Sequence, residues 1–141
     1  MQLTNIKAAV PSEVDETPWQ SITETIFPNR TAGPRDERAL ELCEGMIDIT
    51  AALFNVPSKE IRKAGRTNLG ISRVRQVAMY VAHVVLKLNM TDIGRAFGRD
   101  RTTVLYACHL VEDLRDDPDF DRIITMTERV AHAAFGNRLG L

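Results

Sequence analysis

The stretch that decides the fold covers residues 91–114 and reads TDIGRAFGRDRTTVLYACHLVEDL. Thr91 is predicted to cap a short helix that ends at Phe97, and Asp100 to cap a second helix that continues to about Leu114. Gly98 lies between them and permits a sharp reversal that a bulkier residue would oppose. Two helices joined by so brief a turn form a helix-turn-helix.

A helix-turn-helix needs apolar residues that lock its helices together, a small residue where they touch, and polar residues at the start of the second helix. Gly94 is the small residue, and the predicted locking set is Ile93, Phe97, Val104 and Leu105. The residues left to face outward are Arg99, Asp100, Arg101, Thr102, Thr103 and Tyr106.

These outward side chains suit the major groove of duplex DNA. An Arg can donate two hydrogen bonds to guanine, and an Asp can accept one from the amino group of cytosine. A Thr can form a hydrogen bond through its hydroxyl or contact a thymine methyl group. The alternative is that the helix-turn-helix is a plain packing unit and that Asp100 is only an N-cap.

The charge of the chain favours a DNA partner because it is unevenly distributed. The net charge is -1, but residues 59–109 contain ten Lys and Arg against three acids. The acids concentrate in residues 1–58, nine against four basic residues, and in residues 110–122, six against two. Such a split predicts one anion-seeking surface on an otherwise acidic body.

Helical periodicity on both sides of the motif predicts an all-α fold of about five to six helices, and no alternating pattern typical of strands is found. The other predicted helices cover 35–54; 59–64, capped by Ser58 and ended by Gly65; 72–88, capped by Ser72; and 119–136, after Pro118. The apolar faces predicted for the last two are Val74, Val77, Ala78, Val81, Val84, Val85 and Leu88, and Ile123, Ile124, Met126, Thr127, Val130, Ala131 and Ala134.

Residues 1–34 are interpreted as an N-terminal arm, and residues 35–141 as the domain. The arm holds four of the six prolines and few long apolar runs, which is typical of extended or disordered sequence. Trp19, Ile22 and Ile26 have helical spacing within it. They indicate either a segment folded against the domain or a motif that binds a partner.

Two segments resemble the C-terminal DNA-binding domain, domain IV, of the bacterial replication initiator DnaA. They are IGRAFGRDRTTVLYAC at residues 93–108 and SRVRQVAM at residues 72–79, which is similar to the Arg-x-Arg-Gln segment of that domain's long helix. The resemblance covers roughly residues 36–130. It implies the fold that domain IV shares with the Trp repressor and sequence-specific binding of double-stranded DNA.

The resemblance assigns contacts to both grooves. Arg73 would enter the minor groove, and the residues that would meet base edges in the major groove are Asp100, Arg101, Thr102 and Thr103. An inserted Arg reads the width of the minor groove, so a monomer that touches both grooves can specify about nine base pairs. Phosphates, which position the domain and make affinity depend on salt, would be held by Lys63, Arg66, Arg75, Gln76, Thr91 and Arg99.

The chain departs from the family pattern in several places. The family motif has His where this chain has Arg101, and Arg is longer, permanently charged and prefers guanine, so a different sequence preference is expected. The family often has Pro at the position of Thr91 and a charged residue at that of Leu110. The 141 residues also contain no GxxxxGK[ST] phosphate loop, so the ATP-driven loading of an origin by the AAA+ module of DnaA is not expected.

Other chemistry is not indicated. Cys43 and Cys108 are 65 positions apart, without a nearby His at zinc-ligand spacing. No paired carboxylates or nucleophile with a base stands out, so neither an enzyme nor a cofactor is predicted. No apolar stretch approaches the roughly 18 residues of a membrane span, and no signal-peptide core is found, so a cytoplasmic, nucleoid-associated protein is expected.

Three functional hypotheses follow. The favoured one is a stand-alone relative of domain IV that occupies DnaA-box-like sites and modulates replication initiation or nearby transcription. The second is a transcriptional regulator that reads a different site, as Arg101 would allow. The third is an interaction protein whose Trp19 and acidic surface bind the initiator or its regulators directly. The oligomeric state stays open.

Overall fold

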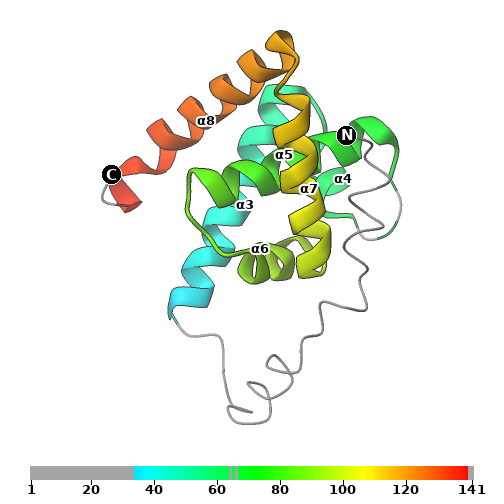
Figure 1. Ribbon diagram of the computed structural model, residues 1–141. Coiled ribbons are helices and arrows are strands. Elements are labelled where there is room, and N and C mark those ends of the chain that lie inside the picture. Colours follow the sequence, from blue (N-terminus) through cyan, green and yellow to red (C-terminus); the bar gives the residue numbers. More distant parts are fainter. Residues whose placement is uncertain (1–33, 64, 66, 140–141) are drawn as a thin grey trace.

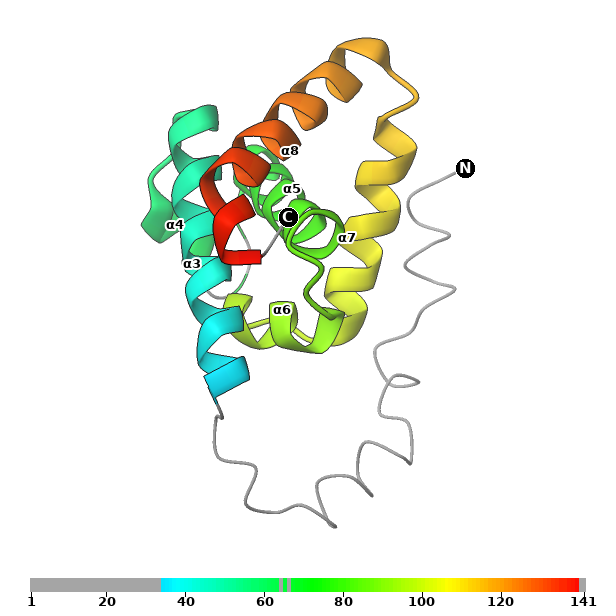
Figure 2. The same ribbon diagram turned by 90° about the vertical axis from the view of Figure 1, so that its left-hand side faces the viewer.

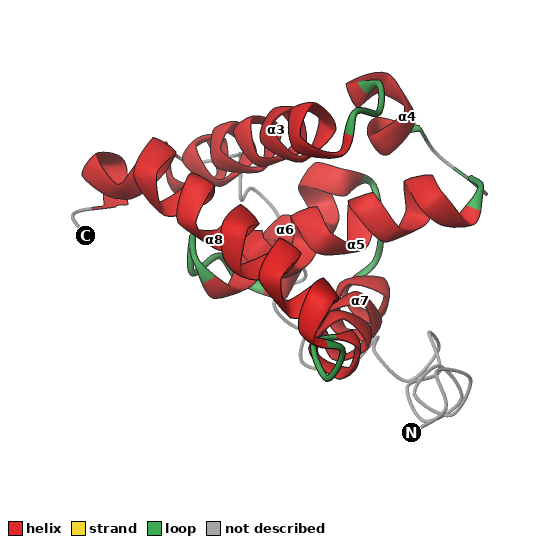
Figure 3. Ribbon diagram, turned by 90° about the horizontal axis from the view of Figure 1, so that it is seen from above, coloured by secondary structure: helices red, strands yellow, loops and turns green. Residues whose placement is uncertain are grey.

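The computed structural model describes residues 34–63, 65 and 67–139, which form six helices (Figure 1). They are α3 (Pro34–Phe54), α4 (Ser58–Arg62), α5 (Leu69–Val84), α6 (Met90–Phe97), α7 (Arg101–Leu114) and α8 (Pro118–Leu139). These residues contain no strand, and the all-α prediction is confirmed (Figure 3). None of these helices is both long and apolar enough to cross a bilayer. The predicted arm, with Trp19, Ile22 and Ile26, lies outside the described residues except for Pro34.

Helix α5 is the centre of the bundle. It packs between α3 and α7, while α6 closes one end against α3 and α7, and α8 crosses α3 and α5 (Figure 2). Burial of one large apolar side chain contributes roughly 1.5–3 kcal/mol, so a shared core holds α6 and α7 firmly onto α3 and α5. Its most buried side chains include Met46, Ile47, Val77, Val81, Ile93, Val104, Val111 and Ile124.

Helices α5 and α6 begin earlier than predicted. Asn68 caps α5 by accepting a hydrogen bond from the Ile71 amide at 2.9 Å, and Asn89 caps α6 in the same way. The predicted caps, Ser72 and Thr91, are therefore wrong, since both residues lie inside their helices. Asn is as strongly favoured at this position as Ser or Thr, so residue type alone does not choose between them.

Helix α4 is a short element whose two ends differ from the prediction. It starts at Ser58, with Pro57 as an N-cap that makes no side-chain hydrogen bond, and it ends at Arg62. Gly65 follows with a φ of 82°, the left-handed conformation that glycine adopts without strain. The prediction that Gly65 ends this helix is wrong, because α4 already ends at Arg62 and the C-cap, Lys63, is extended.

The buried faces of α5 and α8 are narrower than predicted. Val84 is 42% exposed, and Ile123 and Met126 are 39% and 44% exposed. Helix α8 also continues through Gly136 to Leu139. Because α8 lies on the outside of the bundle, only one stripe of it meets α3 and α5, and the buried residues of that stripe are Ile124, Thr127, Ala131 and Phe135.

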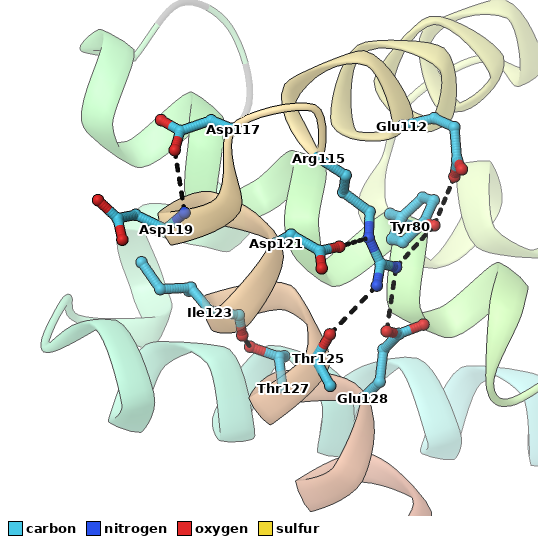
Figure 4. A network of polar contacts seen from close by, with 10 residues as sticks. All are labelled: Tyr80, Glu112, Arg115, Asp117, Asp119, Asp121, Ile123, Thr125, Thr127 and Glu128. Carbon is cyan, nitrogen blue, oxygen red and sulfur yellow. Dashed lines mark hydrogen bonds and ion pairs between the residues drawn. The ribbon is translucent and has the colours of Figure 1, made fainter.

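A polar network around Arg115 fastens α8 to α5 and α7 (Figure 4). The Arg115 guanidinium donates to Asp121 at 2.6 Å and to the Tyr80 hydroxyl at 3.1 Å, and pairs with Glu128 at 3.0 Å. The Tyr80 hydroxyl donates to Glu112 at 2.5 Å. Burial, followed by the bond to Glu112, raises the pKa of Tyr80 to about 12. The neighbouring α7–α8 turn is acidic and exposed, with Asp116, Asp117 and Asp119 at its surface.

Candidate nucleic-acid interface

The turn between α6 and α7 is built as the sequence predicts. Gly98 has a φ of 65°, and the Arg99 amide donates to the carbonyl of Gly94 at 2.8 Å. A Cβ placed on Gly94 would lie 2.6 Å from the carbonyl oxygen of Arg99, so the close approach assigned to Gly94 is confirmed. Of the predicted locking set, Leu105 is partly buried and the other three are buried: Ile93, Phe97 and Val104.

Asp100 caps α7 and holds its first turn together. Its Oδ1 accepts from the Thr103 amide at 2.7 Å, the Thr103 hydroxyl at 2.8 Å and the Thr102 hydroxyl at 2.6 Å. Partial burial raises the pKa of Asp100, but the hydrogen bonds from the two threonines outweigh it and lower the pKa below its ordinary value. The cap therefore carries a negative charge at neutral pH, at the positive end of the α7 dipole.

The predicted base-reading residues of α7 are not all at the surface. Asp100 is exposed, and Arg101, Thr103 and Tyr106 are partly exposed. Thr102, which was predicted to face outward, is only 5% exposed, so that prediction is wrong. Its hydroxyl is turned to Asp100, since a threonine at the second position of a capped helix can reach the capping carboxylate.

Arg99 joins this turn to the connection between α4 and α5. Its Nη2 donates to the carbonyl of Lys63 at 3.1 Å and to that of Gly65 at 3.3 Å. Two of the predicted phosphate-binding residues, Lys63 and Arg99, are thus brought together from positions 36 apart in the chain. Arg66, predicted to bind phosphate beside them, lies outside the described residues.

Arg73 and Gln76 form a pair on the first turns of α5. Arg73 Nη1 donates to Gln76 Oε1 at 3.2 Å, and both side chains are partly exposed. Thr91 is exposed in the first turn of α6, at the opposite end of that helix from Gly98. No described contact joins Thr91 to the other candidates.

Arg75 differs from its prediction. The residue is only 6% exposed, and its guanidinium donates inward to the carbonyls of Ile61, at 2.8 Å, and Glu60, at 3.2 Å, and to the Thr67 hydroxyl, at 3.2 Å. The expectation of an outward contact with a phosphate is wrong for this side chain. Burial, followed by the charge of nearby Arg99, lowers the pKa of Arg75.

Sequence reasoning missed three acceptors that shape this surface: the carbonyls of Lys63 and Gly65 and the hydroxyl of Thr67. Backbone carbonyls carry no residue-type signal, so spacing could not have found the first two. Within the described part of the chain, no group of three His, Cys, Asp or Glu could hold a metal ion. Burial raises the pKa of Cys43 to about 12 and that of Cys108 to about 11, which keeps both thiols protonated.

Residues 43–111, from the middle of α3 almost to the end of α7, match the family described as the bacterial DnaA protein helix-turn-helix. The chain carries the DnaA-family helix-turn-helix domain. This is the domain IV-like class of DNA-binding domain that the two sequence segments resemble. The matched region includes the connection held by Arg99, the α6–α7 turn and both helices of the motif.

Two curated sequence relatives are DnaA proteins. The chain is 34% identical over 98 residues to the chromosomal replication initiator protein DnaA of Mycobacteroides abscessus, which covers 67% of this chain and 20% of that protein. It is 37% identical over 81 residues to the DnaA of Lachnoclostridium phytofermentans, and this match covers 56% of this chain and 18% of that protein. The chain thus spans about a fifth of the length of these curated relatives.

Two solved structures share the fold. One, a DNA replication initiation factor, has a TM-score of 0.65 and 24% identity, covering 94% of this chain and 46% of that one. The other is the replication initiator DnaA bound to AMPPCP and single-stranded DNA. It has a TM-score of 0.62 and 20% identity, and the match covers 92% of this chain and 44% of that one. At these identities the likeness establishes the fold alone.

Proposed function

We propose that this protein binds double-stranded DNA sequence-specifically at sites resembling DnaA boxes. By occupying them it modulates the initiation of replication or nearby transcription, without ATPase activity of its own. One observation carries the proposal: Arg99 bonds to the α4–α5 connection, which puts Lys63 beside the start of α7. A protein with this function works in the cytoplasm, on the nucleoid.

In this proposal the start of α7 lies in the major groove. Arg101 and Thr103 reach base edges, and the Asp100 carboxylate, which the hydrogen bonds from Thr102 and Thr103 hold in place, accepts from a cytosine amino group. Thr102 contributes by orienting Asp100. Arg73 enters the adjacent minor groove, where a cation is attracted most strongly if the groove is narrow.

Phosphates on either side of these bases position the domain. The proposed phosphate ligands are side chains that precede or flank the reading elements: Lys63, Arg66, Gln76, Thr91 and Arg99. Such contacts release counterions, so affinity should fall steeply as salt rises.

The experiment that tests the proposal is selection of bound sequences from a random pool of DNA duplexes at low ionic strength. Enrichment of a motif related to the DnaA box supports the proposal. Absence of any association with random or genomic duplexes would refute it, because phosphate contacts alone give measurable non-specific binding at low salt.

A second candidate function is a transcriptional regulator that reads a different site. It is favoured by Arg101, which stands where the family motif has His and which prefers guanine. Competition separates the two candidates: an unlabelled DnaA box displaces the selected duplex only if the two sites are related.

A further inference from the structure

The connection between α4 and α5 is held by polar contacts more than by packing. Ile61 is fully buried, but Arg62, Lys63, Gly65, Asn68 and Leu69 are exposed, Leu69 by 74%. A segment whose described residues are mostly exposed opens locally unless other groups restrain it. Two arginines, one from each side, supply that restraint.

Arg75 acts from the inside, at the C-terminal end of α4. The carbonyls of Glu60 and Ile61 belong to the last turn of α4, where carbonyls lack partners within the helix and the helix dipole is negative. The Arg75 guanidinium donates to both of them. Because α4 has five residues and no side-chain N-cap, it depends on such outside contacts to stay helical.

The same guanidinium reaches the far end of the connection. Arg75 Nη1 donates to the Thr67 hydroxyl, which also pairs with Ser72 of α5 at 2.9 Å. One side chain therefore bridges the end of α4 to the residues that lead into α5. Lys63 lies between these two points, and Arg73 follows one turn after Leu69.

Arg99 acts on the same segment from the outside, through the carbonyls of Lys63 and Gly65. Its backbone amide is fixed by Gly94 in the α6–α7 turn. The connection is thus hydrogen-bonded on one side to Arg75 of α5 and on the other to Arg99 of the helix-turn-helix.

We propose that Arg75 is a positioning residue for DNA binding, which holds Lys63 and Arg73 at the separation from α7 that the two grooves of a duplex require. The inference rests on the proposed function. Arg75 itself does not contact DNA: its Nε, Nη1 and Nη2 each donate to a protein oxygen, and little of the residue is exposed. A phosphate would have to displace those acceptors.

The test uses the full chain with two variants of Arg75. Arg75→Met keeps most of the aliphatic side chain and removes the guanidinium group, and Arg75→Lys keeps the positive charge. Arg129→Met, an exposed change on α8, is the control for loss of one positive charge. Amide hydrogen exchange of residues 59–68 is measured without DNA, and duplex affinity by fluorescence anisotropy. A positioning role predicts at least tenfold faster exchange there, with α7 amides unchanged, and at least tenfold weaker binding for both Arg75 variants.

A double-mutant cycle separates positioning from direct contact. If Arg75 acts by placing Lys63, then Lys63→Ala weakens binding strongly in the parent protein and little in the Arg75→Met background. Equal effects of Lys63→Ala in both backgrounds, with unchanged exchange and near-parent binding by Arg75→Lys, would overturn the proposal and make Arg75 a phosphate ligand.

Three further outcomes are decisive. Faster exchange with unaltered affinity would leave Arg75 a structural residue and also overturn the proposal. If Arg75→Met fails to fold, Arg75→Lys carries the test, because a lysine keeps the charge but cannot bridge three acceptors. If the parent protein binds no duplex, the proposed function fails, and the exchange data still report whether Arg75 holds the connection.

Discussion

Gly94 and Arg99 touch across the turn of the helix-turn-helix so closely that no side chain fits between them. A Cβ on Gly94 would lie 2.6 Å from the Arg99 carbonyl oxygen and 3.3 Å from the carbonyl carbon of Asp100. Both atoms belong to backbone that also carries the cap of α7, so neither can give way without moving that helix.

We therefore expect Gly94→Ala to destabilise the fold by about 1–3 kcal/mol, the cost of forcing an extra methyl group into a packed site. Urea denaturation measures this loss, and duplex affinity should fall with it because the start of α7 shifts. Gly136→Ala is the matched control: its Cβ would meet only the His132 ring, at 3.8 Å, and a helical Gly→Ala change gains up to about 1 kcal/mol. Equal stabilities for the two variants would contradict the close approach.

Asp100 should make stability depend on acid pH. Its pKa in the folded protein is lowered, so its contribution is fully present above the ordinary value near 3.8 and is lost as pH falls through the folded pKa. Asp100→Ala should cost about 1 kcal/mol near neutral pH through loss of the N-cap.

Asp100→Asn keeps an acceptor at the N-cap but cannot titrate. The gap in unfolding free energy between the parent and this variant should shrink as pH falls from neutral to about 3. Denaturation at several pH values checks the trend, and a constant gap would mean that the carboxylate charge is not stabilised by α7.

Arg101 and Lys63 should respond differently to removal. Arg101→Ala is expected to cost about 1–3 kcal/mol on the selected duplex and little on a scrambled one, because a bidentate base contact is lost. Lys63→Ala is expected to weaken both duplexes alike and to reduce the slope of log affinity against log salt by about 0.9. Anisotropy titrations on both duplexes at two salt concentrations distinguish them, and equal losses for Arg101→Ala would remove it from the base-reading set.

Arg115→Met should loosen α8. The change leaves Asp121, Glu128 and Tyr80 without their shared cation, and because Arg115 is partly exposed we expect a loss of about 1–3 kcal/mol. Arg122→Met removes the more exposed pair with Asp119 and should cost about 1 kcal/mol or less.

Hydrogen exchange across α8, together with duplex affinity, checks the Arg115 prediction. Exchange should quicken in α8 while affinity stays near that of the parent, because α8 packs on α3 and α5, away from the start of α7 (Figure 1). A larger loss of affinity than of stability would show that α8 also supports the reading helix.

The sequence predicts the helix-turn-helix best, because its determinants are local. Gly94, Gly98 and Asp100 each act on backbone within a few residues, and α7 begins and ends where the pattern indicates. Helix starts were predicted less well. Asn68 and Ser72 are both good capping residues by type, and only the structure shows that Asn68 accepts from the amide of the buried Ile71.

The roles of basic residues could be predicted only in part. Arg73 and Arg75 stand two positions apart and have the same side chain, yet one is partly exposed and the other faces the end of α4, 14 residues back in the chain. That contact depends on how α4 packs against α5, and the residues of the Arg-x-Arg-Gln segment alone do not predict this packing. Thr102 is similar, since its side-chain direction is chosen by the cap.

Helix α7 differs in charge between its two ends: Arg99 and Arg101 outnumber Asp100 at its start, and Asp116 and Asp117 outnumber Arg115 after its last residue. Over 14 residues these groups are separated by roughly 20 Å, which gives α7 and its flanking residues an electric dipole moment. In the field of a polyanion such a dipole experiences a torque that turns its positive pole forward during diffusion. Most encounters would then begin in a productive orientation, and added salt would slow association by weakening that alignment.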